Sequence, residues 1–348
     1  MRQSTQQTEN ENRQLVLSER PQGEPTEQTL RLESKAVPTP AAGQMRLRTV
    51  FLSLDPYMRG RMSDAPSYAP PVELGEVMVG GTVARVHSSK LNNFKVGDWV
   101  LCANGWQDYA LSDGQGVTKL ANDLEHPSWA LGILGMPGFT AWAGLLKIGQ
   151  PQAGETVVVA AATGPVGSTV GQIAKIKGCR VVGIAGGGEK CTHAVKHLGF
   201  DACINHRSDD FETELAAKLP DGIDVYFENV GGRVFDAVLP HLNANARIPV
   251  CGMVSQYNAT KLPDGPDRMG WLMGQLLRKR ITMRGFIIFD DFAPLYPEFA
   301  KEMGEWLKAE RIHYREEVIH GLEEAPAAFI GLLRGENFGK RVIQVGAL

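Results

Sequence analysis

The stretch that decides the fold is ETVVVAAATGPVGSTVGQIAKIKG, residues 155–178. Its first part, Glu155–Ala161, contains three consecutive valines, so both faces are apolar, as in a buried strand of a parallel sheet. A tight turn over Thr163–Gly167 follows, and the apolar residues of Val166–Gly178 recur at helical spacing. A strand, a glycine turn and a helix in this order predict the phosphate-binding half of a dinucleotide site.

The glycines of this turn depart from the full dinucleotide fingerprint. The string reads Ala162-x-Gly164-x-x-Gly167, with alanine where the first glycine usually stands. Taken alone it is weak, because many glycine-rich turns are only turns. Its position after a strand and before a helix favours a nucleotide site.

Size and composition limit the class of protein. A chain of 348 residues exceeds the usual size of one hydrophobic core, so we expect two domains. There are 36 Lys and Arg residues against 39 Asp and Glu, so nothing in the charge balance argues for a nucleic-acid surface. The five cysteines contain no C-x-x-C pair, which favours free thiols in a reducing, cytoplasmic setting. No stretch approaches the roughly 20 apolar residues of a membrane span, and residues 1–14 are expected to form a flexible tail.

The order of elements predicts an α/β chain with a smaller β-rich part. Short strands separated by Pro and Gly turns are expected up to about residue 120, including 14–18, 30–33 and 44–53. From residue 155 strands and helices alternate, which predicts a Rossmann-type doubly wound parallel sheet. Strands at His313–Ile319 and Arg341–Val345 come too late for that sheet and are returned to the first domain. The domains are therefore 15–134 with 310–348, and 135–309.

Several strings resemble one protein family. Phe94–Val100 is similar to the barrel turn of the medium-chain dehydrogenase/reductase superfamily, and Leu134–Ala141 to its crossing between domains. More specific strings resemble its zinc-independent prostaglandin and leukotriene reductase group, bacterial enone reductases in particular, over residue 13 to the end: SLDPYMRGRM (53–62), ENVGG (228–232), CGMVSQYN (251–258), GFII (285–288), HYREE (313–317) and GENFGK (335–340). The resemblance implies a GroES-like β-barrel catalytic domain, a Rossmann domain, a homodimer and NADPH-dependent reduction of the carbon–carbon double bond of enones and alkenals.

The choice of cofactor is predicted at the end of the second Rossmann strand. NAD-specific sheets place an acidic residue there, whereas this chain has Gly186–Gly188 followed by Lys190, whose ammonium can pair with a 2′-phosphate. Glu189 is expected to face solvent. His206 stands where the family commonly has tyrosine, so the chain departs from the family at this position. The resemblance implies the following cofactor contacts: Thr163, Gly164, Pro165, Val166, Gly167, Gly186, Lys190, His206, Asn229, Cys251, Gly252, Tyr257, Phe286 and Asn337.

A zinc site is not expected. Zinc-dependent relatives carry a cysteine, a Gly-His-Glu string and a four-cysteine lobe, but here the corresponding stretches are Ser53-Leu54-Asp55 and Leu74-Gly75-Glu76, and the lobe is missing. Without thiolate and imidazole groups there is no tetrahedral site. Glu76 is interpreted as a structural carboxylate.

Tyrosines are the expected catalytic groups. Hydride addition to an enone collects negative charge on the carbonyl oxygen, and a neutral hydroxyl donor stabilises that charge. The resemblance implies Tyr257 and Tyr57 as the catalytic residues, with Tyr257 at the substrate. It also implies that Tyr57, Tyr68 and Arg59 line the pocket.

Each of these residues has a structural alternative. A loop tyrosine is usually packing, and Asn229 and Asn337 precede or lie near glycines as in ordinary turns. Arg59 and Arg61 could hold an anionic substrate tail, but they fit a solvated rim equally well. A quinone oxidoreductase and a non-catalytic NADPH-binding protein remain open as alternative functions.

Overall fold

The computed structural model describes residues 11–261 and 265–348. The chain divides into two compact units. The Rossmann unit consists of Gly132–Glu317 and Gly335–Lys340. The barrel unit consists of residues 11–131, Val318–Arg334 and Arg341–Leu348. None of the described helices is long and apolar enough to cross a lipid bilayer.

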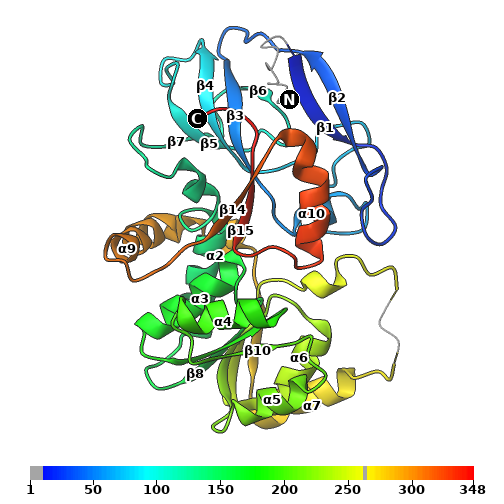
Figure 1. Cartoon of the computed structure of the whole chain (residues 1–348), viewed down its shortest axis with the longest axis vertical. Coiled ribbons are helices and arrows are strands. Elements are labelled where there is room, and N and C mark those ends of the chain that lie inside the picture. Colours follow the sequence, from blue (N-terminus) through cyan, green and yellow to red (C-terminus); the bar gives the residue numbers. More distant parts are fainter. Residues whose placement is uncertain (1–10, 262–264) are drawn as a thin grey trace, which may run out of the picture. The chain divides into compact units, whose positions relative to one another are not determined.

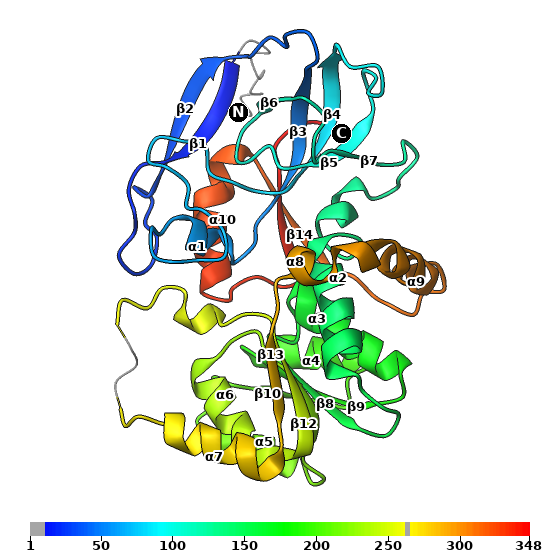
Figure 2. The ribbon, with the colours of Figure 1, turned by 180° about the vertical axis from the view of Figure 1, so that it is seen from behind.

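The Rossmann unit contains the predicted parallel sheet (Figure 2). The strands run in the order β10-β9-β8-β11-β12-β13, which is the doubly wound order with a reversal between β8 and β11. Val157, Val158 and Val159 of β8 are fully buried, as their consecutive placement predicts. The strand bounds are β8 Thr156–Ala160, β9 Arg180–Ala185, β10 Ala202–Asn205, β11 Ile223–Phe227, β12 Leu242–Val250 and β13 Thr282–Gly285.

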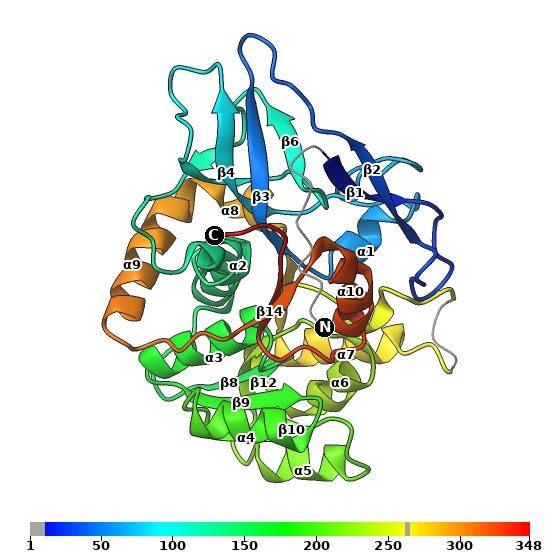
Figure 3. The same ribbon diagram turned by 45° about the horizontal axis from the view of Figure 1, so that its top comes forward.

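Helices connect these strands and pack against the sheet (Figure 3). Phe211 and Leu215 of α5 and Val238 of α6 share one core with β8, β9 and β12. The strand expected at Ile281–Ile288 is shorter, because the chain turns into helix α8 at Ile288. The helix bounds are α2 Met136–Ala143, continued by a π-helical turn Gly144–Gly149, α3 Pro165–Ile176, α4 Gly188–Lys196, α5 Phe211–Ala217, α6 Gly232–Val238, α7 Met269–Lys279, α8 Ile288–Phe292 and α9 Tyr296–Lys308.

The barrel unit is built on a seven-stranded sheet of order β14-β15-β3-β4-β5-β7, with β6 paired to β3 (Figure 1). The two late strands β14 and β15 join this sheet, as predicted from the sequence. Met45, Leu47 and Val100 belong to one of its cores, whereas Leu52, Met58 and Phe329 belong to another. The bounds are β1 Glu11–Leu17, β2 Leu30–Ala36, β3 Met45–Ser53, α1 Met58–Arg61, β4 Thr82–Ser89, β5 Trp99–Cys102, β6 Tyr109–Ser112, β7 Thr118–Lys119, β14 Glu316–His320, α10 Ala325–Leu333 and β15 Lys340–Gln344.

The predicted flexible tail is wrong at its carboxyl end. Glu11–Gln14 belong to β1, which pairs antiparallel with β2 from Glu11 opposite Ala36 to Leu17 opposite Leu30. The polar residues 11–14 show no local pattern that predicts a strand. They form one because β2 provides the partner strand for the backbone hydrogen bonds. Residues 1–10, the rest of the expected tail, lie outside the described residues.

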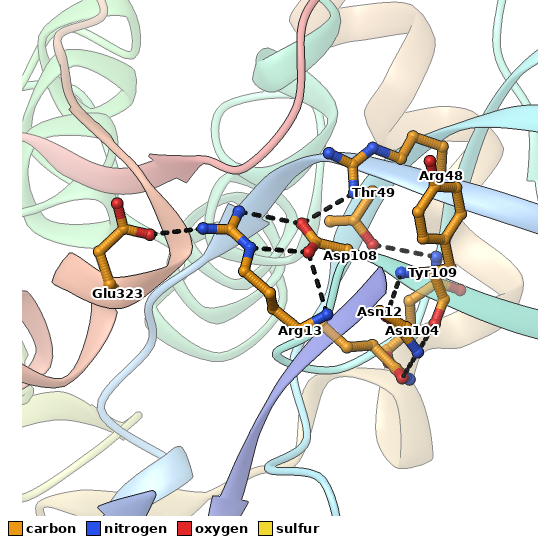
Figure 4. A network of polar contacts seen from close by, with 9 residues as sticks. Asn12, Arg13, Arg48, Thr49, Asn104, Asp108, Tyr109 and Glu323 are labelled. Atoms are coloured by element: carbon orange, nitrogen blue, oxygen red, sulfur yellow. Dashed lines mark hydrogen bonds and ion pairs between the residues drawn. The ribbon is translucent and has the colours of Figure 1, made fainter. Parts of the chain in front are cut away.

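One charged network joins β1 to the sheet of the barrel unit (Figure 4). The Asp108 carboxylate, of which 4% is exposed, accepts hydrogen bonds from Arg13 Nε at 2.8 Å and pairs with Arg48 Nη1 at 2.8 Å. Arg13 Nη1 also contacts Glu323 at 2.8 Å. Two guanidinium groups therefore depend on one nearly buried carboxylate.

Candidate active site

The turn between β8 and α3 brings the helix unusually close to the strand. Ala161 has a left-handed backbone, with φ of +53°, and its carbonyl oxygen accepts a hydrogen bond from Gly164 N–H at 2.9 Å. A Cβ atom at Gly167 would lie 2.2 Å from the same oxygen. Only glycine therefore allows α3 to begin at this distance from β8. The backbone at Ala162 is not left-handed, which explains why alanine is accepted at the position of the missing glycine.

The residues of this turn fit the pyrophosphate of a dinucleotide. The first-turn N–H groups of Val166 and Gly167 have no acceptor within the helix, and the dipole of the twelve-residue helix α3 favours an anion at this end. Gly164 is half-buried, and the atom nearest to its Cβ position lies 3.4 Å away. The two glycines thus differ: Gly167 is required by the protein's own packing, whereas Gly164 leaves room above the turn.

Residues 335–340, the GENFGK string, contact both ends of this candidate site. Gly339 N–H donates to Thr163 O at 3.1 Å, beside the glycine turn. At the other end Lys190 Nζ donates to Gly335 O at 2.6 Å. The Asn337 amide donates to Gly339 O at 2.9 Å, so this side chain stabilises its own loop, and its contact with a cofactor stays a prediction.

Basic groups gather where β9 ends. A Cβ atom at Gly186 would lie 3.1 Å from His206 Nε2 and 3.1 Å from Arg207 Nε. Lys190 lies in the first turn of α4, and Glu189 beside it is exposed, as expected. Glycine at position 186 therefore allows an imidazole and a guanidinium to approach the end of β9, the region where a 2′-phosphate is predicted.

The charges around His206 act on its titration. Burial lowers the pKa of His206, and the positive charges of Arg207, Arg233 and Lys190 lower it further. The imidazole is thus poised to take up a proton when a phosphate anion approaches. Arg207 was missed by the sequence reasoning, although its position directly after His206 could have indicated it.

Glu228 organises the loop after β11 and was also missed. Glu228 is only 2% exposed. One oxygen of its carboxylate accepts hydrogen bonds from the N–H groups of Val230, at 2.5 Å, and Gly231, at 2.9 Å. The Tyr226 hydroxyl donates to its other oxygen at 3.1 Å. Burial raises the pKa of Glu228 in spite of these donors. The ENVGG string is therefore a loop whose backbone N–H groups donate to the carboxylate of its own first residue, Glu228.

Tyr257, Gly252 and Asn229 lie together at the carboxyl edge of β11 and β12. A Cβ atom at Gly252 would lie 3.0 Å from the Tyr257 hydroxyl and 3.6 Å from Asn229 O. The Asn229 amide donates to Ala160 O at 2.8 Å and so connects β8 to β11 where the strand order reverses. In open α/β sheets this reversal is the position of the ligand crevice. The neighbouring half-buried Tyr257 phenol is therefore placed where a reacting group is expected.

Two other predicted cofactor residues are placed as packing groups. Burial and the nearby Glu228 raise the pKa of Cys251 to about 12, so this thiol stays protonated. Phe286 is buried, and its ring lies where a Cβ atom of Gly144 would be only 2.7 Å away. Any contact of Phe286 with a cofactor would therefore involve its backbone.

In the barrel unit the SLDPYMRGRM string forms the end of β3 and helix α1. Ser53 Oγ donates to the buried Asp55 carboxylate, and Tyr57 is the half-buried residue before α1. Burial raises the pKa of Tyr57, and the Asp55 charge and the nearby Tyr68 raise it further. Tyr57 is therefore a neutral hydroxyl at any ordinary pH, and Tyr68 lies close to it.

The structure gives Arg59 a role different from the expected one. It is 6% exposed, and its Nη2 donates to Pro21 O at 3.1 Å and to Gly23 O at 2.7 Å. Burial lowers the pKa of this guanidinium. These contacts hold the chain around residues 21–23 and argue against a binding site for an anionic substrate tail.

Arg61 likewise serves the loop that follows α1. Its guanidinium donates to Ala69 O and to Ser67 Oγ, the latter at 3.0 Å. It also lies 4.6 Å from the centre of the Tyr68 ring. Tyr68, with 57% of its surface exposed, is thus held by a cation–π contact rather than by the core.

Metal ligands are not grouped in the part of the chain that the structure describes. Over residues 11–261 and 265–348 no cluster of three or more His, Cys, Asp or Glu side chains could hold a metal ion. Glu76 is exposed.

Two family descriptions match the sequence. Residues 13–120 match "N-terminal domain of oxidoreductase", and residues 165–308 match "Zinc-binding dehydrogenase".

Individual proteins are similar over nearly the whole chain. The NADPH-dependent curcumin reductase of Escherichia coli (strain K12) is 63% identical over 334 residues, which cover 96% of this chain and 97% of that protein. Prostaglandin reductase 1 of Mus musculus is 40% identical over 329 residues, covering 93% and 96%. The crystal structure of CurA in complex with NADPH from Vibrio vulnificus superposes with a TM-score of 0.95 at 62% identity, covering 97% of this chain and 100% of that one.

Proposed function

Because the chain belongs to the prostaglandin reductase group of the medium-chain dehydrogenase/reductase family, we propose that it reduces the carbon–carbon double bond of α,β-unsaturated ketones and aldehydes with NADPH. The observation that carries the proposal is the Tyr257 hydroxyl beside Gly252 and Asn229, at the reversal of the strand order. A hydroxyl donor at this edge meets the requirement of enone reduction, in which charge develops on an oxygen.

The cofactor is NADPH, and the Rossmann unit offers a group for each of its phosphates. The N-terminus of α3 and the glycine turn suit the pyrophosphate. Lys190, His206 and Arg207 suit a 2′-phosphate, since charged hydrogen bonds to phosphate are strong. When bound, NADPH supplies the hydride.

Tyr257 is proposed to stabilise the enolate. Hydride addition to the β-carbon leaves negative charge on the carbonyl oxygen, and a fixed phenol donates a hydrogen bond that strengthens as the charge grows. The same phenol is a suitable relay for the proton that reaches the α-carbon. Tyr57 is assigned to substrate binding, where its raised pKa keeps it a neutral donor.

Steady-state kinetics with identified products test this function. An enone should be consumed with NADPH and the saturated ketone should accumulate, without allylic alcohol. Tyr257→Phe should remove about 1–3 kcal/mol of transition-state stabilisation, which lowers kcat roughly 5- to 150-fold, and most of its effect should fall on kcat. Tyr57→Phe is the matched variant and should act mainly on KM.

Three outcomes would contradict the proposal. Full kcat in Tyr257→Phe would remove the catalytic assignment. Turnover of quinones but not of enones would favour a quinone oxidoreductase. NADPH binding without turnover of any conjugated substrate would favour a non-catalytic binding protein.

We also propose that two copies of the chain associate through the Rossmann unit. Strand β13 is the last strand of its sheet, and the nearby helix α7 exposes Met269, Met273 and Leu277 to 59%, 56% and 80%. An open strand edge beside exposed apolar side chains is a suitable surface for self-association. Sedimentation at micromolar concentration should give twice 37.9 kDa, and Leu277→Lys should shift the species toward the monomer; a monomeric parent protein would refute this.

A further inference from the structure

Two cysteines of the Rossmann unit lie in direct contact. Cys191 belongs to α4 and Cys203 to β10, elements that pack side by side (Figure 3). Their Sγ atoms are 2.9 Å apart, and both residues are half-buried. Of the other three cysteines, Cys102 and Cys179 are buried. The pair needs a movement of less than about 1 Å between the sulfurs to reach the disulfide length of roughly 2.05 Å.

The two thiols are chemically unequal. The Cys203 thiol donates a hydrogen bond to Cys191, which lowers the pKa of Cys191, and a backbone hydrogen bond from Ala185 lowers it as well. The contact with Cys191 raises the pKa of Cys203, and burial adds to this. Burial raises the pKa of Cys102 and of Cys179 to about 11. Cys191 also lies in the first turn of α4, where the helix dipole favours a negative charge. Cys191 is therefore assigned as the nucleophile of the pair, because the thiolate is the reactive form.

We propose that Cys191 and Cys203 form a peroxide-sensitive dithiol site whose oxidation weakens NADPH binding. The Cys191 thiolate attacks one oxygen of hydrogen peroxide, the O–O bond breaks, and a sulfenic acid and one water form once the leaving hydroxide is protonated. Cys203 sulfur then attacks the sulfenic sulfur, the S–O bond breaks, and a second water leaves with the thiol proton. Two thiols lose two electrons and two protons, and peroxide becomes two waters. A dithiol reductant returns the disulfide to two thiols by exchange and is itself oxidised to a disulfide.

The effect on NADPH rests on the function proposed above. Lys190 directly precedes Cys191, and Asn205, two residues after Cys203, accepts N–H groups from Gly187 at 2.8 Å and Arg207 at 3.0 Å. A disulfide draws the first turn of α4 toward β10 and displaces Lys190 from the groups around Gly186. The loss should fall on NADPH more than on NADH, which lacks the 2′-phosphate.

Peptide mapping after mild peroxide treatment of the reduced full-length protein tests the site. We expect a cross-linked peptide pair containing Cys191 and Cys203, lost on addition of dithiothreitol. Cys203→Ser should give no cross-link and should trap a dimedone adduct on Cys191. Cys179→Ser, a matched control outside the pair, should keep the cross-link. Absence of the cross-link, or dimedone labelling elsewhere in Cys203→Ser, would overturn the proposal.

Cofactor titration tests the consequence. Oxidation should raise the Kd for NADPH at least threefold, change the Kd for NADH less, and have no effect in Cys191→Ser. A cross-link with unchanged NADPH affinity would overturn the coupling. If the reduced protein fails to bind NADPH at all, the proposed function is refuted while the mapped disulfide still stands, so the two failures are distinguishable.

Discussion

Replacing Gly167 by alanine should destabilise the Rossmann unit before any cofactor is considered. The added Cβ would lie 2.2 Å from Ala161 O, 2.8 Å from Ala161 C and 3.1 Å from Ala160 O. All three atoms are backbone, and they belong to the end of the central strand β8 and its turn, which cannot yield as a flexible side chain would. Overpacking of this kind typically costs 1–3 kcal/mol, and backbone neighbours place Gly167→Ala near the upper end, at about 2–3 kcal/mol.

Gly164 provides the matched control three residues away. Its Cβ position has one neighbour, Ala161 O at 3.4 Å, and its φ of −74° suits alanine. Gly164→Ala should therefore change stability by less than about 1 kcal/mol, the usual scale for a residue before a helix. It should instead weaken NADPH binding, because the methyl group occupies the open side of the turn where the pyrophosphate is expected.

Thermal unfolding by circular dichroism, followed by NADPH titration, separates the two roles. At about 2–4 °C per kcal/mol, Gly167→Ala should lower the unfolding midpoint by roughly 4–12 °C without cofactor. Gly164→Ala should keep its midpoint and raise the Kd for NADPH. The reasoning is refuted if Gly167→Ala unfolds with the parent protein, or if Gly164→Ala is the less stable of the two.

Three further perturbations test other parts of the molecule. Lys190→Ala should weaken NADPH binding by about 1.5–3 kcal/mol and leave NADH binding unchanged; equal kcat/KM for both cofactors in the parent protein would contradict the assignment. A phosphate anion stabilises protonated His206, whose pKa is lowered in the free protein, so NADPH affinity should rise severalfold as pH falls from about 8 to 6.5. NADH affinity and the variant His206→Gln should show a flat profile, and a flat profile for NADPH in the parent protein would refute this. Asp108→Ala leaves the guanidiniums of Arg13 and Arg48, 22% and 17% exposed, without their shared carboxylate. It should lower the free energy of unfolding by about 2–3 kcal/mol in denaturant melts, and an unchanged midpoint would show that the network contributes nothing.

Much of the fold follows from local sequence patterns. The consecutive valines of β8, the glycine turn and the helical spacing of α3 predict the first β-α unit nearly to the residue, and Arg180–Ala185 is the observed β9. These signals are local because burial of both strand faces and the backbone demands of a tight turn each act within a few residues. The strand at Glu11–Gln14 was missed for the complementary reason, since only pairing with β2 makes it a strand.

The residues of the candidate site likewise fall into those that local sequence indicates and those that only the fold brings together. Residue type and position after a strand suffice to indicate Gly167, because the helix begins so close to the strand that a side chain has no room there. Lys190 is indicated by its position after the next strand, and its contact with a phosphate stays a prediction. The sequence also carries the family likeness that points to Tyr257. No local pattern shows that Arg59 binds the carbonyls of Pro21 and Gly23, because that contact depends on chain segments far apart in sequence.

By itself, then, the sequence determined the parallel sheet, the two-domain order and the NADPH cofactor, because each depends on short-range periodicity or on a few residues at fixed spacing. Only the tertiary structure decided three contacts: the hydrogen bond from Lys190 to Gly335 O, the position of Arg207 and His206 beside Gly186, and the contact between the sulfur atoms of Cys191 and Cys203. These contacts join residues on different elements, and their geometry is set by the packing of the helices on the sheet. The local sequence around either residue does not show this packing.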